Sequence, residues 1–294
     1  MRSFLDSGED FKRSYFGLST TTTDFGHNGF NSQCPLLGAP EQLEDLRVRL
    51  EEMKEQEQPD ASVIDRRQDH LWETRPKLIH LLIDAHASFN LLPRTLFLAV
   101  NILDRYCSKQ TVYKNKYNLA GFSALLIASK LIDEPDKAPH IRDLLVFCQD
   151  NDDHLSFIAM ERHILTRLEW TISHATIDVF VDLMTTMEGH DEEVRHMATY
   201  LSFLCLSYRA SFETTPFDMA RSCISVAVFI LKQAVGNLIP SDPLESWILS
   251  TFCNLSGSTY EAAWCKNDRF AEVARKLEAF RDQPRHSLRR VQED

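Results

Sequence analysis

The chain has little glycine. It contains nine glycines in 294 residues, and five of them lie within the first 40. Beyond residue 40 only Gly121, Gly189, Gly236 and Gly257 remain. Doubly wound sheets, phosphate-binding loops and nucleophile elbows need glycine where the backbone turns sharply or touches a ligand. The body of the chain is therefore not expected to have any of these folds, and we expect it to be helical.

Basic charge, paired cysteines and long apolar runs are also scarce. The 32 Lys and Arg against 43 Asp and Glu give a net charge of −11, which argues against a general nucleic-acid binder. The seven cysteines are scattered, and the sequence has no C-x-x-C or H-E-x-x-H motif. Its apolar runs are far shorter than the ~20 residues of a membrane span, and its N-terminus lacks a signal peptide's apolar core. We therefore expect an intracellular protein with no metal, cofactor, nucleic-acid or membrane partner.

The sequence pattern divides the chain into five parts. The first, which holds STTTTD and most of the glycine, is expected to be a disordered tail. The second contains a highly charged helix at 41–57 with a thin apolar stripe, which should pack against another part of the protein. The predicted parts are a tail (1–40), an N-terminal helix and lead-in (41–70), two helical domains (71–172 and 173–282) and a C-terminal tail (283–294).

Apolar residues at helical spacing predict two sets of five helices. The first set lies near 72–88, 94–108, 117–133, 139–148 and 154–170, and the second near 176–187, 192–210, 216–235, 243–254 and 258–281. Pro76, Pro93 and Pro139 are expected in first turns, and the stretches beginning at Thr215 and Asp242 resemble capping boxes. The third helix of each set is apolar on almost every face, as a central helix is. The prediction is an all-α protein with two five-helix domains, each around its buried third helix.

No set of residues has the pattern of an active site. The run Gly121-Phe122-Ser123 lacks the second glycine of a nucleophile elbow and lies inside an apolar helix. The acidic residues at 133–134 and 150–153 fit a helix end and a polar connection, without the glycine of a calcium-binding loop. We therefore expect no enzymatic activity of the chain's own.

Four charged residues lie within otherwise apolar helices: Arg75, Asp104, Lys130 and Glu161. An ionised group is rarely buried without a partner. Two residues of each sign predict either two ion pairs or one pair plus residues that face another protein. The pattern equally allows each of them to lie on the solvent edge of its helix.

Four stretches resemble the cyclin box, in the variant of the fungal G1/S cyclins. They are PDASVID, WETRPKLIHLLIDAHASFNLLPRTLFLAVNILDRYCSK, GFSALLIASKLIDE and FIAMERHILTRLEW, within about 59–172. The resemblance implies tandem cyclin folds and a non-catalytic subunit that binds and activates a cyclin-dependent protein kinase, in the nucleus and cytoplasm, at the G1/S transition. A kinase of phosphate metabolism or transcription, or a scaffold that activates no kinase, is the alternative. A DNA-binding factor with the same tandem fold would be basic and carry a zinc ribbon, unlike this chain.

The resemblance also implies roles for individual residues. Lys130 and Glu161 match the signature pair that hydrogen-bonds the kinase, and Arg75 and Asp104 match a structural ion pair. Apolar kinase contacts would come from Ile127, Leu131, Leu165, Trp170 and Ile172, for which ordinary core packing is the alternative. A groove for kinase substrates or inhibitors would include Leu78, Leu81 and Asn118, altered because TRPKL replaces the usual Met-Arg-Ala-Ile-Leu. The N-terminal helix would pack near the junction of cyclin and kinase.

Overall fold

The computed structural model describes residues 48, 51–54, 56, 58–68, 70–148, 152–232, 242–254 and 268–281. Within these residues every regular element is a helix, so the all-α prediction is confirmed. Both predicted tails, and the start of the helix predicted near 258–281, lie outside the described residues.

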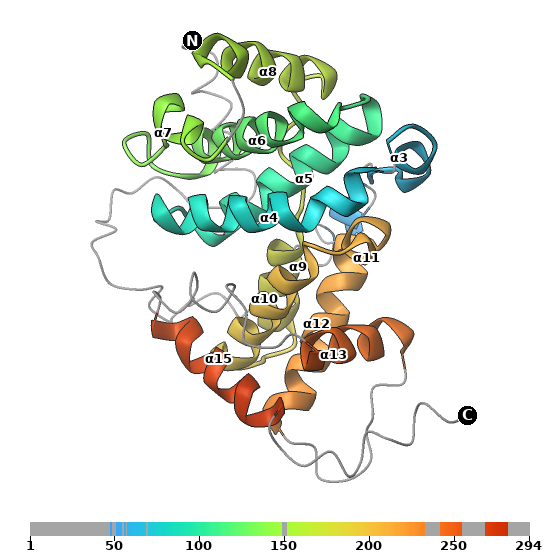
Figure 1. Ribbon diagram of the computed structural model, residues 1–294. Coiled ribbons are helices and arrows are strands. Elements are labelled where there is room, and N and C mark those ends of the chain that lie inside the picture. The colour runs from blue at the N-terminus through green and yellow to red at the C-terminus, as the bar shows by residue number, and fades with distance from the viewer. Residues whose placement is uncertain are drawn as a thin grey trace.

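The helices follow one another as two groups (Figure 1). The first comprises α3 (Ala61–Arg67), α4 (His70–Ser88), α5 (Pro93–Lys109), the 3-10 turn η1 (Lys114–Lys116), α6 (Tyr117–Ile132), α7 (Ile141–Leu145) and α8 (His154–Arg167). The second comprises α9 (Ile177–Met187), α10 (Glu192–Cys205), α11 (Arg209–Glu213), α12 (Pro216–Lys232), α13 (Pro243–Asn254) and α15 (Asp268–Arg281).

Helix α6 is the centre of the first group. It contacts α4, α5 and α8, and all but one of its residues from Tyr117 to Ser129 are buried. Its apolar sequence explains this position, because a helix without a polar face loses stability wherever it meets water. Gly121 lets α4 approach closely, since a Cβ there would lie 2.9 Å from the methyl carbons of Leu78.

Helix α12 has the matching place in the second group, against α9, α10, α13 and α15. Its start is capped by the predicted pair of residues: the Thr215 hydroxyl accepts the Asp218 backbone N–H at 3.1 Å and donates to the Asp218 carboxylate at 2.7 Å. The groups meet where the rings of Phe97 and Phe203 lie 4.3 Å apart. A shared core therefore joins α5 to α10.

Residues 51–54 and 56, which precede α3, pack against the second helix group and the link between the two groups. Met53 is buried, the Lys54 ammonium lies 3.7 Å from the centre of the Phe217 ring, and the Gln56 side chain accepts the Ala175 N–H at 2.7 Å. This segment thus spans the junction of the two helix groups.

Three expectations about helix bounds were wrong. Pro76 lies inside α4, because this helix begins at His70, six residues earlier. The helix expected over 139–148 is only Ile141–Leu145. The helix expected over 192–210 ends at Cys205, and the Leu206 carbonyl accepts the Arg75 Nε–H at 3.1 Å instead of continuing the helical ladder. A buried side chain from the other group thus binds the carbonyl that follows the end of α10.

Candidate partner-binding surface

Lys130 and Glu161 form an ion pair at the surface of the first helix group. Lys130 lies in the last turn of α6 and Glu161 in the middle of α8, and the ammonium and carboxylate are 2.5 Å apart. Their side chains remain 39% and 19% exposed. The pair is thus accessible to another protein, and its position is fixed by the packing of α6 on α8.

Helix α8 is held on α5 by a half-buried polar contact. The Tyr106 hydroxyl lies 2.7 Å from His163 Nδ1, and burial raises the pKa of Tyr106 to about 12. Burial also lowers the pKa of His163. This contact fixes the helix that carries Glu161.

Two of the predicted apolar contacts lie at the surface. Leu131 is half-buried beside Lys130, and Trp170, just after α8, is 58% exposed. Trp170 has φ +61° and the preceding Glu169 has φ +52°. Left-handed backbone costs a non-glycine residue about 1–2 kcal/mol, and such residues gather at functional sites. Here both residues belong to the end of α8, where the Trp170 N–H donates to the Leu165 carbonyl at 2.9 Å, and this turn leaves the indole exposed to solvent.

The other three predicted contacts are packed inside the chain. Ile127, Leu165 and Ile172 are 2%, 5% and 7% exposed and belong to the hydrophobic core. In the free chain they support the surface from below.

Sequence reasoning missed two exposed apolar residues on α8. Ile158 is 44% exposed and lies three residues before Glu161, so the two side chains share one helix face. Leu155, one turn earlier, is 71% exposed. Their signal was present, because α8 has apolar residues on more faces than one buried stripe requires. The candidate surface therefore comprises the Lys130–Glu161 pair with Leu131, Leu155, Ile158 and Trp170.

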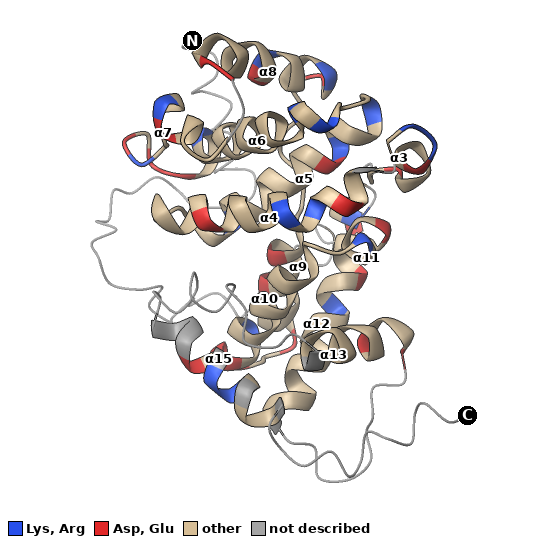
Figure 2. Cartoon of the chain, in the orientation of Figure 1, with Lys and Arg blue, Asp and Glu red and all other residues tan. Residues whose placement is uncertain are grey.

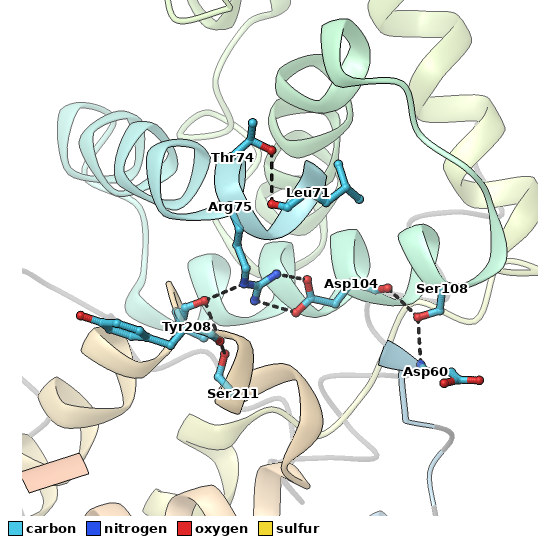
Figure 3. A network of polar contacts seen from close by, with 9 residues as sticks. Asp60, Leu71, Thr74, Arg75, Asp104, Ser108, Tyr208 and Ser211 are labelled. Atoms are coloured by element: carbon cyan, nitrogen blue, oxygen red, sulfur yellow. Dashed lines mark hydrogen bonds and ion pairs between the residues drawn. The ribbon is translucent and has the colours of Figure 1, made fainter. Parts of the chain in front are cut away.

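Arg75 and Asp104 form a buried bidentate ion pair between α4 and α5 (Figure 3). One Nη donates to Asp104 Oδ2 at 2.9 Å and the other donates to Oδ1, while Nε donates to the Leu206 carbonyl. Ser108 extends the network, because its hydroxyl donates to the Asp104 carbonyl at 2.9 Å and accepts the Asp60 N–H at 3.1 Å. Arg75 thus connects both helix groups and the lead-in.

Burial and pairing act in opposite directions on this pair. Burial raises the pKa of Asp104, and the adjacent Arg75 opposes that rise. Burial disfavours the charged form of Arg75, but the Asp104 carboxylate more than offsets this and raises the pKa of Arg75. Each charge therefore depends on the other.

The residues predicted for a docking groove differ in exposure. Leu78 is buried against Gly121, while Leu81 and Asn118 are half-buried on α4 and α6. The surface part of this candidate groove is thus limited to Leu81 and Asn118.

The described residues offer no group of three or more His, Cys, Asp or Glu side chains placed to hold a metal ion. None of the helices in the described part of the chain is long and apolar enough to cross a membrane.

The fold and this surface define a helical interaction module. A model of the cyclin N-terminal domain matches residues 47–173. The chain is 44% identical over 117 residues to a G1/S-specific cyclin, CCN1, of Candida albicans, covering 40% of this chain and 17% of that protein. It is 30% identical over 196 residues to the G2/mitotic-specific cyclin cdc13 of Schizosaccharomyces pombe, covering 67% of this chain and 39% of the relative.

A solved structure shows the same fold over more of the chain. A viral cyclin from herpesvirus saimiri superposes with a TM-score of 0.53 at 16% identity, covering 82% of this chain and 96% of the viral one. The chain belongs to the cyclin family. It spans less than half the length of the two curated relatives described above.

Proposed function

We propose that the chain is a non-catalytic regulatory subunit that binds and activates a cyclin-dependent protein kinase at the G1/S transition. The observation that carries this proposal is the Lys130–Glu161 pair, which lies at the surface of the cyclin N-terminal domain with exposed apolar residues on the same helix. A charged donor and acceptor side by side suit the ends of a partner helix, whose backbone N–H and C=O groups are unsatisfied.

Activation would follow from binding energy alone. A kinase needs its helix αC glutamate paired with the ATP-positioning lysine, and the active arrangement is one of several conformations. A subunit that binds the active conformation more tightly shifts the population towards it without contributing a catalytic group.

The test uses the purified full chain, a monomeric cyclin-dependent kinase, ATP and histone. We expect histone phosphorylation only when both proteins are present, and kinase affinity reduced by about 1–3 kcal/mol by Lys130→Ala or by Glu161→Ala. Lys276→Ala is the matched control, because this lysine is 44% exposed and pairs with Glu193 at the other end of the molecule (Figure 1). Undiminished kinase binding by the Lys130/Glu161 double variant would refute the assignment of the surface.

The timing of action has a second candidate. Similarity to cdc13 extends over 196 residues, compared with 117 for CCN1, which favours a mitotic role as the alternative. Loss of the protein from synchronised cells should cause arrest with unreplicated DNA if it acts at G1/S. Arrest with replicated DNA would support the mitotic role.

Its location follows from the same proposal. A tagged chain should be found in both nucleus and cytoplasm, and complete exclusion from the nucleus would contradict a role at the G1/S transition.

A further inference from the structure

A basic surface lies far from the Lys130–Glu161 pair. Residues 105–116 contain four Lys or Arg and no Asp or Glu, although the chain as a whole carries a charge of −11. Figure 2 shows Lys and Arg at the end of α3 and near it at the adjoining ends of α5 and α6. We define the basic cluster as Arg66, Arg67, Lys109 and Lys114, all of them in this part of the molecule.

Buried Gln68 holds the basic cluster together. Its side-chain amide donates to the Cys107 carbonyl at 2.6 Å and accepts the Val112 N–H at 2.7 Å, so the end of α3 is fixed against the end of α5 and the approach to η1. At the start of α3 the Asp60 N–H donates to the Ser108 hydroxyl. Lys109 therefore lies beside α3, and Lys114 lies two residues after Val112, whose N–H Gln68 binds.

The acidic groups near the cluster are mostly engaged elsewhere. The Asp65 carboxylate accepts hydrogen bonds from Arg209 at 2.8 and 2.9 Å and from the Trp72 indole at 2.8 Å. Asp152 pairs with Lys116, and Asp60 caps α3 through the Ser62 N–H. The cluster thus keeps a local excess of positive charge, with Tyr113 next to it 73% exposed.

We propose that the basic cluster binds a polypeptide segment carrying phosphorylated serine or threonine. Arg67 offers a planar guanidinium group and Lys109 and Lys114 offer ammonium groups, the donors that bind phosphate. The Arg66 guanidinium adds positive charge, although its Nε and one Nη donate to Ser62. The surface covers only the ends of α3 and α5 and the start of η1, and the chain's negative charge repels a long polyanion, so a phosphopeptide fits it better than a nucleic acid.

The position of the cluster connects it to the proposed function. Lys116 and Lys130 lie near opposite ends of α6, about 21 Å apart at 1.5 Å per residue. A kinase bound at Lys130 would leave the basic cluster exposed. The choice of a phosphopeptide rests on the proposed function in one respect: a bound serine/threonine kinase would generate phosphorylated segments nearby.

The test is fluorescence anisotropy with the full chain and a short labelled peptide carrying two phosphoserines. We expect Arg67→Ala/Lys114→Ala to weaken binding by at least about tenfold, with weaker binding also at higher salt. Arg142→Ala/Lys276→Ala is the control, because it removes the same charge from exposed sites on α7 and α15. Equal loss in both double variants, or none in the first, would overturn the proposal.

Two further probes define the ligand. A peptide with glutamate in place of each phosphoserine should bind at least about fivefold more weakly, since each phosphate carries about two charges and three acceptor oxygens. Equal binding of that peptide, or tighter binding of a single-stranded oligonucleotide of the same charge, would contradict a phosphopeptide site. The Arg67/Lys114 variant should still activate the kinase. Phosphopeptide binding without kinase activation would instead leave the site standing and refute the proposed function.

Discussion

Replacing Arg75 by alanine tests how the two helix groups are joined. The substitution removes both hydrogen bonds to Asp104 and the bond to the Leu206 carbonyl. It also removes a guanidinium that lies 5.8 Å from the centre of the Phe212 ring. Asp104, only 6% exposed, would keep its charge with no partner.

The expected loss of stability follows from this geometry. Breaking a buried ion pair costs about 3–5 kcal/mol, because the remaining charge is left without compensation. For a chain of this size, each 1 kcal/mol lowers the melting temperature by about 2–4 °C, so we expect a fall of roughly 10 °C. Arg209→Ala is the matched control: Arg209 also binds a carboxylate, Asp65, with two nitrogens, but its side chain is 45% exposed. Water can replace those contacts, and the melting temperature should change little.

The pH dependence of stability provides a second test of the Arg75→Ala variant. Without Arg75, burial acts unopposed and raises the pKa of Asp104 further above its ordinary value of 3.8. The folded variant then takes up a proton at a higher pH than the unfolded chain does, so its stability relative to wild type rises as pH falls through that interval. In circular-dichroism melts, the difference in melting temperature between the variant and wild type should be smaller at pH 5 than at pH 7. A variant that melts like wild type at pH 7, or whose deficit grows on acidification, would refute the reasoning.

Three other substitutions test single features of the structure. Trp170→Gly relieves a left-handed backbone conformation that costs about 1 kcal/mol, so the melting temperature should match or exceed that of wild type. Kinase affinity should fall about tenfold, and a melting temperature that falls together with the affinity would contradict a binding role. Gly121→Ala places a Cβ against the Leu78 methyls and should cost about 1–3 kcal/mol in urea unfolding; combined with Leu78→Ala, the total loss should be smaller than the sum of the two single losses, and strict additivity would contradict the clash. Asp133→Ala removes acceptors of the Leu92 N–H and Thr95 hydroxyl and should cost about 1–2 kcal/mol by the same measurement; no change would show that these bonds contribute nothing.

The long helices could be predicted because their signals are local. Apolar spacing placed a helix over 117–133, and the structure has α6 at Tyr117–Ile132. Proline at the first position marked the start of α12. The contact at the end of α10 could not be predicted in this way, because it is made by Arg75, 131 residues away in sequence. Periodicity reports which face of a helix is apolar, but not which distant side chain will take a carbonyl from its ladder.

The candidate surface was predictable only in part. The sequence pattern singled out Lys130 and Glu161 as unusual charges but left open whether they pair. The cyclin resemblance grouped the two residues and implied that they bind a kinase. Ile127 and Ile158 both lie in apolar runs, yet Ile127 is 2% exposed and Ile158 is 44% exposed. The difference arises because α6 is enclosed by other helices, whereas α8 lies at the edge of its group (Figure 1). Burial of this kind is a property of the assembled fold.

The pairing of Lys130 with Glu161 makes the surface more selective. A protonated lysine has three donors and a carboxylate about four acceptor sites, and the bond between them uses one of each. The remaining groups can donate to a carbonyl and accept from an N–H without breaking the ion pair. Because each charge is already neutralised, an unrelated acidic or basic surface gains little by binding here. If Lys130 and Glu161 bind the kinase as proposed, they would recognise a backbone carbonyl and N–H at the right separation, and the packing of α6 on α8 and α5 sets that separation.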